Sequence, residues 1–528
     1  MKPSFRHSMG WLHTWAGLVF CWVLYFMFVT GTLGYFDFEV DHWMKPEQVA
    51  IEPAPLAQSL DAALGYLEKE AEGADRWLIS FNEDRSPHPM RLFWSGPEPE
   101  EGEERISGNK QFDPNTGEPV PEDVRATGGG QTLYQMHYSL HYVDGGGAFV
   151  FIAIVTMFMF IGLVTGVVIH ARIFKDLFTF RPSKGGRAWL DMHNLLSVST
   201  LPFQLMITYS GLLFTVTTWM PLIAVGSYGF DIQRVAADLG NLADVRVERA
   251  EEQAELTDLK ALALAAEAEW GAGQVQSVDV KFPYDANSRV VVRREVQVGA
   301  VGESKVYDGV TGEFLRTLNP ASRAPIAVAS VMIGLHEGLY AGTLLRWLYF
   351  FSGLLGAGMV ATGAIYWTVK RRRQASEQEK RGFRFVECMN IGTILGLPIG
   401  IGCYFWANRL LPLGLENRAN WEVHCLFIAW TFCLLYPLTR PARAAWRELA
   451  WAGSAVFGAI PMVNALTTDA HLINSLRGGD WVMASFDVTA LAFGVLFAAV
   501  ARTLGRREAR AQEALETGTE TAAAVGVS

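Results

Sequence analysis

The sequence predicts a polytopic α-helical membrane protein of about eight spans, in which a duplicated four-helix core carries two external α+β modules. The first observation is composition: half of the 528 residues are hydrophobic and only 19% are charged, against about 25% charged in an ordinary soluble domain. The second is length, because a helix needs roughly 20 mostly apolar residues to cross a bilayer. The third is an internal repeat, described below. The candidate spans are residues 14–35, 148–169, 195–217, 344–368, 390–411, 421–439, 449–466 and 482–501.

The basic residues that flank the spans predict the orientation of the chain. Short cytoplasmic flanks carry an excess of Lys and Arg, and the basic flanks fall on one side of the membrane if the spans alternate. They are residues 2–6, 171–188, 370–384, 440–447 and 502–510. Both termini are therefore expected in the cytoplasm, and residues 36–147 and 218–343 outside. The first span is expected to be retained, because FDFEVDHW follows it without a small-residue cleavage site.

Charge and cysteine usage exclude several classes of function. Residues 36–147 hold 22 Asp and Glu against 8 Lys and Arg, which argues against nucleic acid as a partner. The cysteines lie in or beside predicted spans, so no disulfide framework is expected outside. They are Cys21, Cys388, Cys403, Cys425 and Cys433. The sequence lacks CxxCH, which excludes covalently attached c-type haem.

Each external segment reads as a small α+β module. In the first, residues 56–72 have helical periodicity, and residues 76–81 and 89–94 alternate like strands. The second repeats this order, with a helix at 257–270 and strands in 275–298. Each module then has a strand, a turn and a strand. These are QFDPNTGEPV (111–120) and VYDGVTGEFL (306–315), whose Asp and Gly residues suit tight turns.

The repeat extends to the histidines. WLHTWAGL in the first span corresponds to WLDMHNLLSV in the third, which places His13 and His193 at the same cytoplasmic depth. MHYSLHYVDGGG corresponds to LHEGLYAGTLL, which places His137 and His336 at the external face. TGVVIHAR corresponds to TGAIYWTVKR, where Trp stands in place of His170. We therefore predict a duplicated unit of span, external module, His-bearing segment and returning span.

These patterns define the expected organisation of the chain. The last four spans lack the repeat and are expected to form an appended helical unit. The boundaries are 1–35 for the first span, 36–132 for the first module, 133–217 for a His-bearing segment with spans two and three, 218–332 for the second module, 333–375 for a His-bearing segment with span four, 388–504 for the appended unit, and 505–528 for a disordered tail.

Three interpretations compete for the histidines within or beside the spans, where ionisable groups are costly and usually face a bundle interior. Haem iron takes axial imidazoles from the helices of a bundle, and a pair at each face would form a transmembrane electron path. A proton relay would enlist carboxylates in the spans, where the core has almost none. A divalent metal could use His137 and His141, four residues apart, but without nearby carboxylates or thiolates. We favour haem. Arg172 and Arg346 are candidate propionate partners, although ordinary flanking or snorkelling roles suit them equally well.

At this point the residues resemble a known family. LHTWAGL (12–18), HARIFKDLFTFRPSKGGRAWLDMHN (170–194), the DPNTGE and DGVTGE turns and LHEGLYAGTLLRWLYFFSGLLG (335–356) are similar to the PepSY-associated transmembrane family. Its members include iron-regulated inner-membrane proteins and ferric-siderophore reductases that face the periplasm. The resemblance covers about 1–375.

The resemblance implies two PepSY-type modules in the periplasm of a bacterium, a four-helix core in the inner membrane and two b-type haems. By position, the ligand histidines are His13, His137, His193 and His336. We expect His13 with His193 at the cytoplasmic-side haem, with His170 as a further candidate. We expect His137 or His141 with His336 at the external haem.

The expected function is transmembrane electron transfer to a periplasmic acceptor, a ferric siderophore or another ferric chelate, in iron uptake. The expected partners are membrane lipid and an electron donor, which is either cytoplasmic or a quinol. The sequence shows no GxGxxG dinucleotide fingerprint. The alternative is a haem-free membrane protein whose modules bind or sense a ligand. A transporter subunit, built on the last four spans, is a third interpretation.

Overall fold

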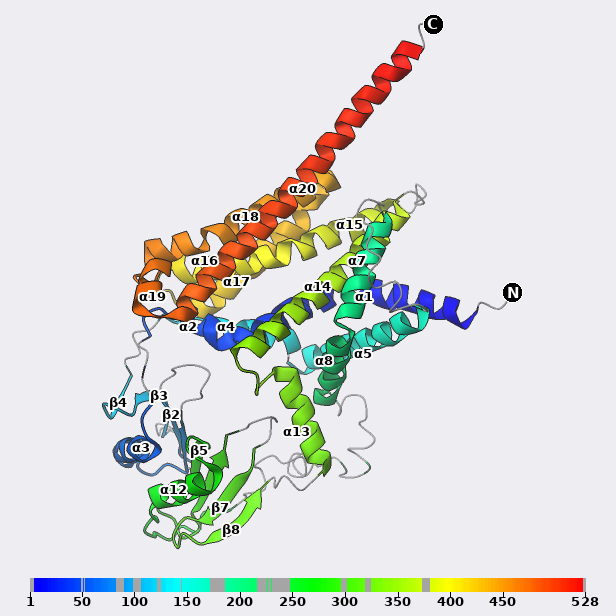
Figure 1. Ribbon diagram of the computed structural model, residues 1–528. Helices are drawn as coiled ribbons and strands as arrows, with labels where there is room; N and C mark the ends of the chain where they lie inside the picture. Colours follow the sequence, from blue (N-terminus) through cyan, green and yellow to red (C-terminus); the bar gives the residue numbers. More distant parts are fainter. Residues whose placement is uncertain are drawn as a thin grey trace. The chain divides into compact units, whose positions relative to one another are not determined.

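The computed structural model describes most of the chain as two compact units (Figure 1). The described residues are 4–48, 51, 53–81, 90–97, 106–120, 125–143, 145–170, 186–215, 226, 229, 247–295, 302–318, 324–372 and 380–525. The membrane unit comprises Met1–Pro46, Arg125–Tyr209 and Thr343–Ser528, and the sheet unit comprises Glu47–Val124 and Ser210–Gly342. Each unit is therefore assembled from segments far apart in the sequence.

The membrane unit holds the long helices. Seven of the described helices are long and apolar enough to cross a membrane, or eight if the bent pair α7 and α8 is one span. The helices are α1 (Phe5–Leu33), η1 (Gly34–Phe36), α2 (Asp37–Met44), α4 (Gly129–Tyr138), α5 (Gly145–Ile169), α7 (Gly186–Ser199), α8 (Leu201–Phe214), α14 (Thr343–Arg371), α15 (Lys380–Ile394), α16 (Gly396–Leu410), α17 (Arg418–Leu435), η3 (Tyr436–Leu438), α18 (Ala442–Thr467), α19 (Leu472–Gly478) and α20 (Trp481–Val525). The chain is thus a multi-pass helical membrane protein.

The third predicted span, 195–217, is bent rather than continuous. Its two helices, α7 and α8, meet at 67°. Pro202, the second residue of α8, has no N–H and disfavours helical backbone in the residue before it. The bend therefore has the usual cause of a sharp helix kink. Beyond it, the fully buried Gln204 donates from Nε2 to the carbonyl of Ser352 on α14 at 3.3 Å.

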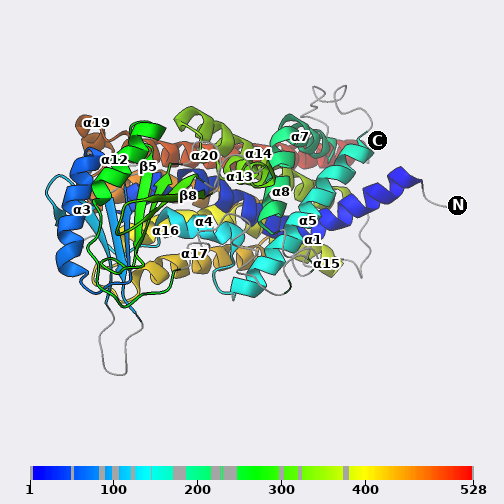
Figure 2. The same ribbon diagram turned by 90° about the horizontal axis from the view of Figure 1, so that it is seen from below.

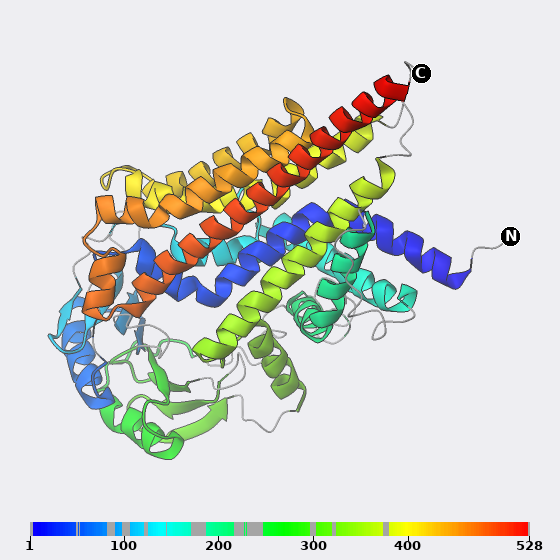
Figure 3. The same cartoon turned by 45° about the horizontal axis from the view of Figure 1, so that its top comes forward.

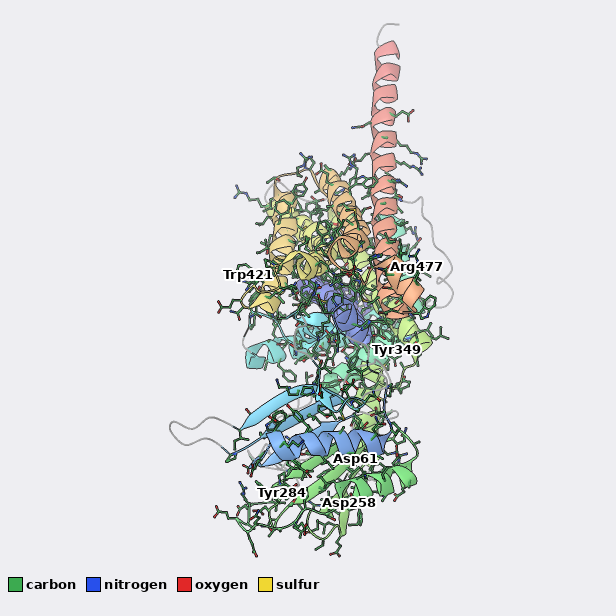
Figure 4. The ribbon with its side chains drawn as sticks, turned by 90° about the vertical axis from the view of Figure 1, so that its left-hand side faces the viewer. Asp61, Asp258, Tyr284, Tyr349, Trp421 and Arg477 are labelled. Atoms are coloured by element: carbon green, nitrogen blue, oxygen red, sulfur yellow. The ribbon has the colours of Figure 1, made fainter. Side chains whose placement is uncertain are left out.

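The remaining helices of the unit pack in two groups. In the first, α1 packs against both α5 and α14, and α14 packs against α7 (Figure 3). Tyr349, which is labelled in Figure 4, lies on α14. It packs edge-on to Phe203 of α8 at 5.4 Å between ring centroids. In the second group, α18 packs along α20 and α16 along α17. Helix α20 continues to Val525, where the composition predicts a disordered tail from residue 505. The Ala, Glu and Arg residues there are good helix formers.

The sheet unit is built on one antiparallel sheet of eight strands. The strand order is β4-β3-β2-β1-β5-β6-β7-β8. The strands are β1 (Arg76–Ser80), β2 (Met90–Ser95), β3 (Ser107–Asp113), β4 (Glu118–Pro119), β5 (Val275–Lys281), β6 (Arg289–Arg294), β7 (Ser304–Asp308) and β8 (Phe314–Leu318). Strand β1 pairs with β5, with Trp77 opposite Val280, so the two predicted modules share a continuous sheet.

Helices α3 (Leu56–Glu70) and α12 (Leu259–Trp270) cover one face of this sheet (Figure 2). Leu60 of α3 and Ala263 of α12 are fully buried against strand residues such as Ile79. Burial of each large apolar side chain stabilises the unit by about 1.5–3 kcal/mol. Lys260 joins the two helices by an ion pair to Asp61 at 2.6 Å (Figure 4). The unit also contains α13 (Ala324–Glu337).

The two turns predicted to be equivalent share the same hydrogen bond and the same glycine conformation. The carboxylates of Asp113 and Asp308 each accept a hydrogen bond from the backbone N–H two residues on, at 2.8 and 3.0 Å. Gly117 and Gly312 then take φ of +75° and +73°. This left-handed backbone strains residues with a Cβ, which is why glycine closes both turns.

Candidate functional site

His13 on α1 and His193 on α7 face one another inside the membrane unit. Their ring centroids are 6.2 Å apart and their planes are inclined by 66°. Nδ1 of His13 donates to the carbonyl of Gly162 at 2.9 Å, and Nδ1 of His193 donates to that of Met359 at 2.8 Å. Because a carbonyl only accepts, each Nδ1 carries the proton and each Nε2 keeps its lone pair. Both imidazoles are therefore in the tautomer that can bind a metal through Nε2.

The two acceptor carbonyls are equivalent in the sequence repeat. Gly162 of α5 and Met359 of α14 are 197 residues apart. Four residues further along each helix come Gly166 and Gly363. A Cβ on these glycines would lie 3.3 and 3.1 Å from the imidazole carbons. Glycine at this position lets the ring reach a carbonyl that also accepts a backbone hydrogen bond within its helix. Both the acceptor carbonyl and the glycine four residues later thus recur in the repeat.

The spacing of the His13 pair fits one iron atom between two imidazoles. A metal–nitrogen distance of about 2.0 Å on each side, added to the radius of the two rings, separates the ring centroids by about 6 Å. Bis-imidazole ligation from the helices of a bundle is typical of b-type electron carriers. Within the part of the chain that the structure describes, no group of three or more His, Cys, Asp or Glu residues could hold a metal ion. A bare metal ion at this pair would therefore lack a third such ligand among the described residues.

His137 on α4 repeats this geometry. Its Nδ1 donates to the carbonyl of Met27 on α1 at 2.8 Å, and the ring lies directly over Gly31, where a Cβ would be 2.6 Å from Nδ1. Again the glycine stands four residues after the carbonyl. In the sheet unit, Nδ1 of His336 is 2.9 Å from the hydroxyl of Ser210. That His137 and His336 share a haem stays a prediction.

His141 lies in a different setting. Helix α4 ends at Tyr138, so His141 does not share a helical face with His137. Its ring stacks on Phe427 of α17 at 6.1 Å and 21°. The divalent-metal interpretation depended on a shared helical face and has no support in this geometry.

His170 and Trp367, which correspond in the repeat, share a property that the sequence does not reveal. His170 Nδ1 and Trp367 Nε1 are both buried without a hydrogen-bond partner among the described residues. The guanidinium of Arg371 lies 4.5 Å from the Trp367 ring and 5.7 Å from Trp15, and its Nη1 also has no described partner. These groups lie one helical turn or more beyond the glycines that contact the His13 pair, so they flank that pair on one side.

Of the two predicted propionate partners, only Arg346 lies among the residues that the structure describes. Arg346 is buried and forms an ion pair with Glu39 of α2, and its guanidinium lies 5.4 Å from the Phe36 ring. Its Nε and Glu39 Oε2 have no partner among the described residues. Arg346 is therefore engaged by a protein carboxylate. Arg172 lies outside the described residues.

A buried polar cluster at the start of α4 was missed from the sequence. Arg418 and Glu422 of α17 form an ion pair whose side chains are fully buried. Glu422 accepts hydrogen bonds from the Thr127 hydroxyl at 2.5 Å and the backbone N–H of Gly128 at 3.1 Å. Tyr404 donates to the carbonyl of Gly129 at 2.9 Å. We call Thr127, Gly128, Tyr404, Arg418 and Glu422 the α4 clamp. The available signal was Glu422 inside the predicted span 421–439, with Arg418 just before it.

Comparison with known proteins agrees with the resemblance. The model of the family described as "PepSY-associated TM region" matches residues 10–370, well over half of the chain. The matched range contains His13, His137, His193 and His336 and ends before α15. No match was found among curated proteins.

Proposed function

The chain belongs to the PepSY-associated transmembrane family, and on that premise we propose that it transfers electrons across a bacterial inner membrane through two b-type haems. The proposed acceptor is a ferric siderophore or another ferric chelate in the periplasm. The observation that carries the proposal is the His13–His193 pair, whose ring centroids lie 6.2 Å apart. Haem held by these two imidazoles would supply one-electron transfer.

The residues of the chain have definite tasks in this function. His13 and His193 would hold one haem through Nε2, and His137 with His336 would hold the other. The carbonyls that accept from Nδ1 fix each ring and raise its basicity. The neighbouring glycines give the rings the room to reach these carbonyls. No protein nucleophile is required, because the cofactor supplies the chemistry.

The electron balance defines what the donor must provide. One electron converts one Fe(III) of the chelate into Fe(II). A quinol would release two electrons and two protons as it becomes a quinone, and would therefore reduce two ferric ions. A cytoplasmic one-electron donor would reduce one ferric ion per encounter.

Optical spectroscopy tests the proposal on the purified full-length protein. We expect a dithionite-reduced minus oxidised spectrum with b-type bands and two haems per chain by pyridine haemochrome. The His193→Ala variant should retain one haem, because only the His13 pair loses a ligand, and His141→Ala should retain two. Well-folded protein from haem-replete cells that lacks these bands would contradict the proposal. It would favour the haem-free binding protein instead.

A further inference from the structure

The sheet face opposite α3 and α12 is strongly basic, and we call it the outer face. Residues that pair across strands share a face of the sheet. The register places Arg76 opposite Lys281 and, next along, Lys281 opposite Arg289. On the outer face of the four central strands, β2, β1, β5 and β6, the described charged residues are Arg91, Arg76, Lys281, Arg289, Arg293 and one carboxylate, Asp279. The next strand, β7, places Asp308 opposite Arg289, and the two form an ion pair at 2.9 Å. Arg289 therefore adds no free positive charge to this face.

The carboxylate of Asp279 already accepts hydrogen bonds from its neighbours on the sheet. Both oxygens of Asp279 accept from Arg76, through Nε and Nη2 at 2.8 Å each, and Nη2 of Arg293 adds a third bond at 2.8 Å. Asp279 is only 2% exposed. Asp279 therefore offsets one of the two guanidinium charges and leaves the outer face with excess positive charge.

Lys281 adds to this excess. It lies two residues after Asp279 and is partly buried. Burial lowers the pKa of Lys281, and the charges of Arg76 and Arg293 lower it further, against the opposing effect of Asp279. The fold thus holds an ammonium group beside two guanidinium groups, at a cost in free energy that a bound anion would offset.

Two buried polar atoms point to a ligand at the same place. The Ser277 side chain is 3% exposed, and its hydroxyl has no hydrogen-bond partner among the described residues. The register places Ser277 opposite Arg293, whose Nε is also buried without a described partner. Buried polar groups are nearly always hydrogen-bonded. These two donors, with the cations Arg76 and Lys281 beside them, favour an acceptor with several oxygens.

We propose that the outer face around Arg76, Ser277, Lys281 and Arg293 binds an anionic ferric chelate, one whose iron is held by carboxylate or catecholate oxygens. This inference rests on the proposed function, because it assigns the chemistry of the electron acceptor. Guanidinium groups suit such oxygens because they bind them in a bidentate manner. The acidic first external segment would repel anions in general. A local basic face is consequently needed for an anionic acceptor to approach.

Equilibrium binding of ferric citrate to the full-length protein in detergent tests this site. The double variant Lys281→Gln with Arg91→Gln removes two cations and leaves the Asp279 bonds in place. We expect the Kd for ferric citrate to rise about tenfold or more, as the loss of charge contacts near a surface predicts. The Kd should also become less sensitive to salt.

The matched control is Lys260→Gln, which removes a cation from the helix-covered side of the same unit and should leave the Kd unchanged. An unchanged Kd in the double variant would overturn the proposal. So would equally tight binding of a neutral ferric trihydroxamate to the wild type. Haem content and the dithionite-reduced spectrum report the proposed function separately, because the substituted residues lie on the sheet and not among the predicted ligands.

Discussion

In the membrane unit, each imidazole that donates to a backbone carbonyl lies against a glycine four residues after that carbonyl. The carbonyls of Met27 and Met359 precede Gly31 and Gly363 by four residues. In a helix such a carbonyl already accepts from the N–H four residues on, and its second lone pair is free for the imidazole. A Cβ at the fourth residue would stand in the way of the ring. A side chain at Gly31 would therefore displace the His137 ring, and one at Gly363 would force the His193 ring to shift by a few tenths of an ångström.

Gly31→Ala tests this requirement. The new Cβ would lie 2.6 Å from His137 Nδ1, so the ring must move and the bond to Met27 is lost. We expect a loss of about 1–3 kcal/mol in stability, as for overpacking elsewhere, and loss of one of two haems. The control is Gly17→Ala on the same helix, where the Cβ meets nothing within 4 Å. It should be neutral or stabilising by up to about 1 kcal/mol. Equal thermal stability and haem content for both variants would contradict the requirement.

The sequence predicted which histidines recur but not what orients them. His13 and His193 stand out because side-chain identity repeats, and the structure brings them together. Their acceptors are backbone atoms, which every residue has, so Gly162 and Met359 carry no signal of their own. His141 and His170 have no histidine counterpart in the repeat, but the sequence does not show what surrounds them. Their surroundings, a stacked Phe427 for the first and no described partner for the second, depend on packing.

At the scale of elements, the segment before α4 depends on helices that lie far along the chain. Residues 125–128 have no regular secondary structure. Their backbone and hydroxyl groups, with the carbonyl of Gly129, bond instead to Glu422 and Tyr404 of the appended helices. Gly129 takes φ of +62°, which glycine tolerates. Since α4 carries His137, the appended helices contribute to the position of a predicted ligand.

Glu422→Ala should show how much depends on the α4 clamp. The substitution leaves the Arg418 guanidinium buried without its carboxylate, which typically costs about 3–5 kcal/mol. Thermal unfolding of the purified protein measures this loss. Glu416→Ala, which changes an exposed acidic residue in the loop before α17, is the control and should change stability little. A small loss for Glu422→Ala would show that the cluster is hydrated and not buried as the structure has it.

Elements with a strong local pattern could be predicted closely. The helix expected at 56–72 forms at Leu56–Glu70, and the strand expected at 76–81 forms at Arg76–Ser80. Their periodicity depends only on which face is buried. The bend in the third span was missed although Pro202 was visible, because the surrounding apolar run has the length of a whole span.

At the scale of the molecule, the two external modules form one sheet by pairing β1 with β5. The repeat predicted two similar modules, but edge pairing between them involves residues about 200 positions apart and leaves no periodic signal. The Arg76–Asp279 bonds cross this seam. The basic outer face likewise exists only once the two modules are joined.

The sheet unit should lose stability in acid. Partial burial raises the pKa of Asp308, but hydrogen bonds from the backbone of Thr311 and Val310 and the charge of Arg289 lower it more, so the net pKa is lowered. A carboxyl whose pKa is lower in the folded state stabilises it above the unfolded pKa of about 3.9. That contribution disappears as the pH falls through the folded pKa. The free energy of unfolding should therefore be flat above about pH 5 and fall below about pH 4.

Hydrogen–deuterium exchange of β7 and β8 peptides in the full-length protein measures this loss, with exposure times adjusted for the intrinsic pH dependence of exchange. Asp308→Asn removes the titrating group but keeps the side-chain shape. It should weaken protection near neutral pH, because a neutral amide accepts the same N–H groups less strongly than a carboxylate. It should also flatten the acid dependence. Equal acid dependence in the variant would mean that other carboxylates control the acid stability of the unit. Asp285 would be the first of these to substitute, because its pKa is also lowered. It joins residues 250–251 to the loop between β5 and β6.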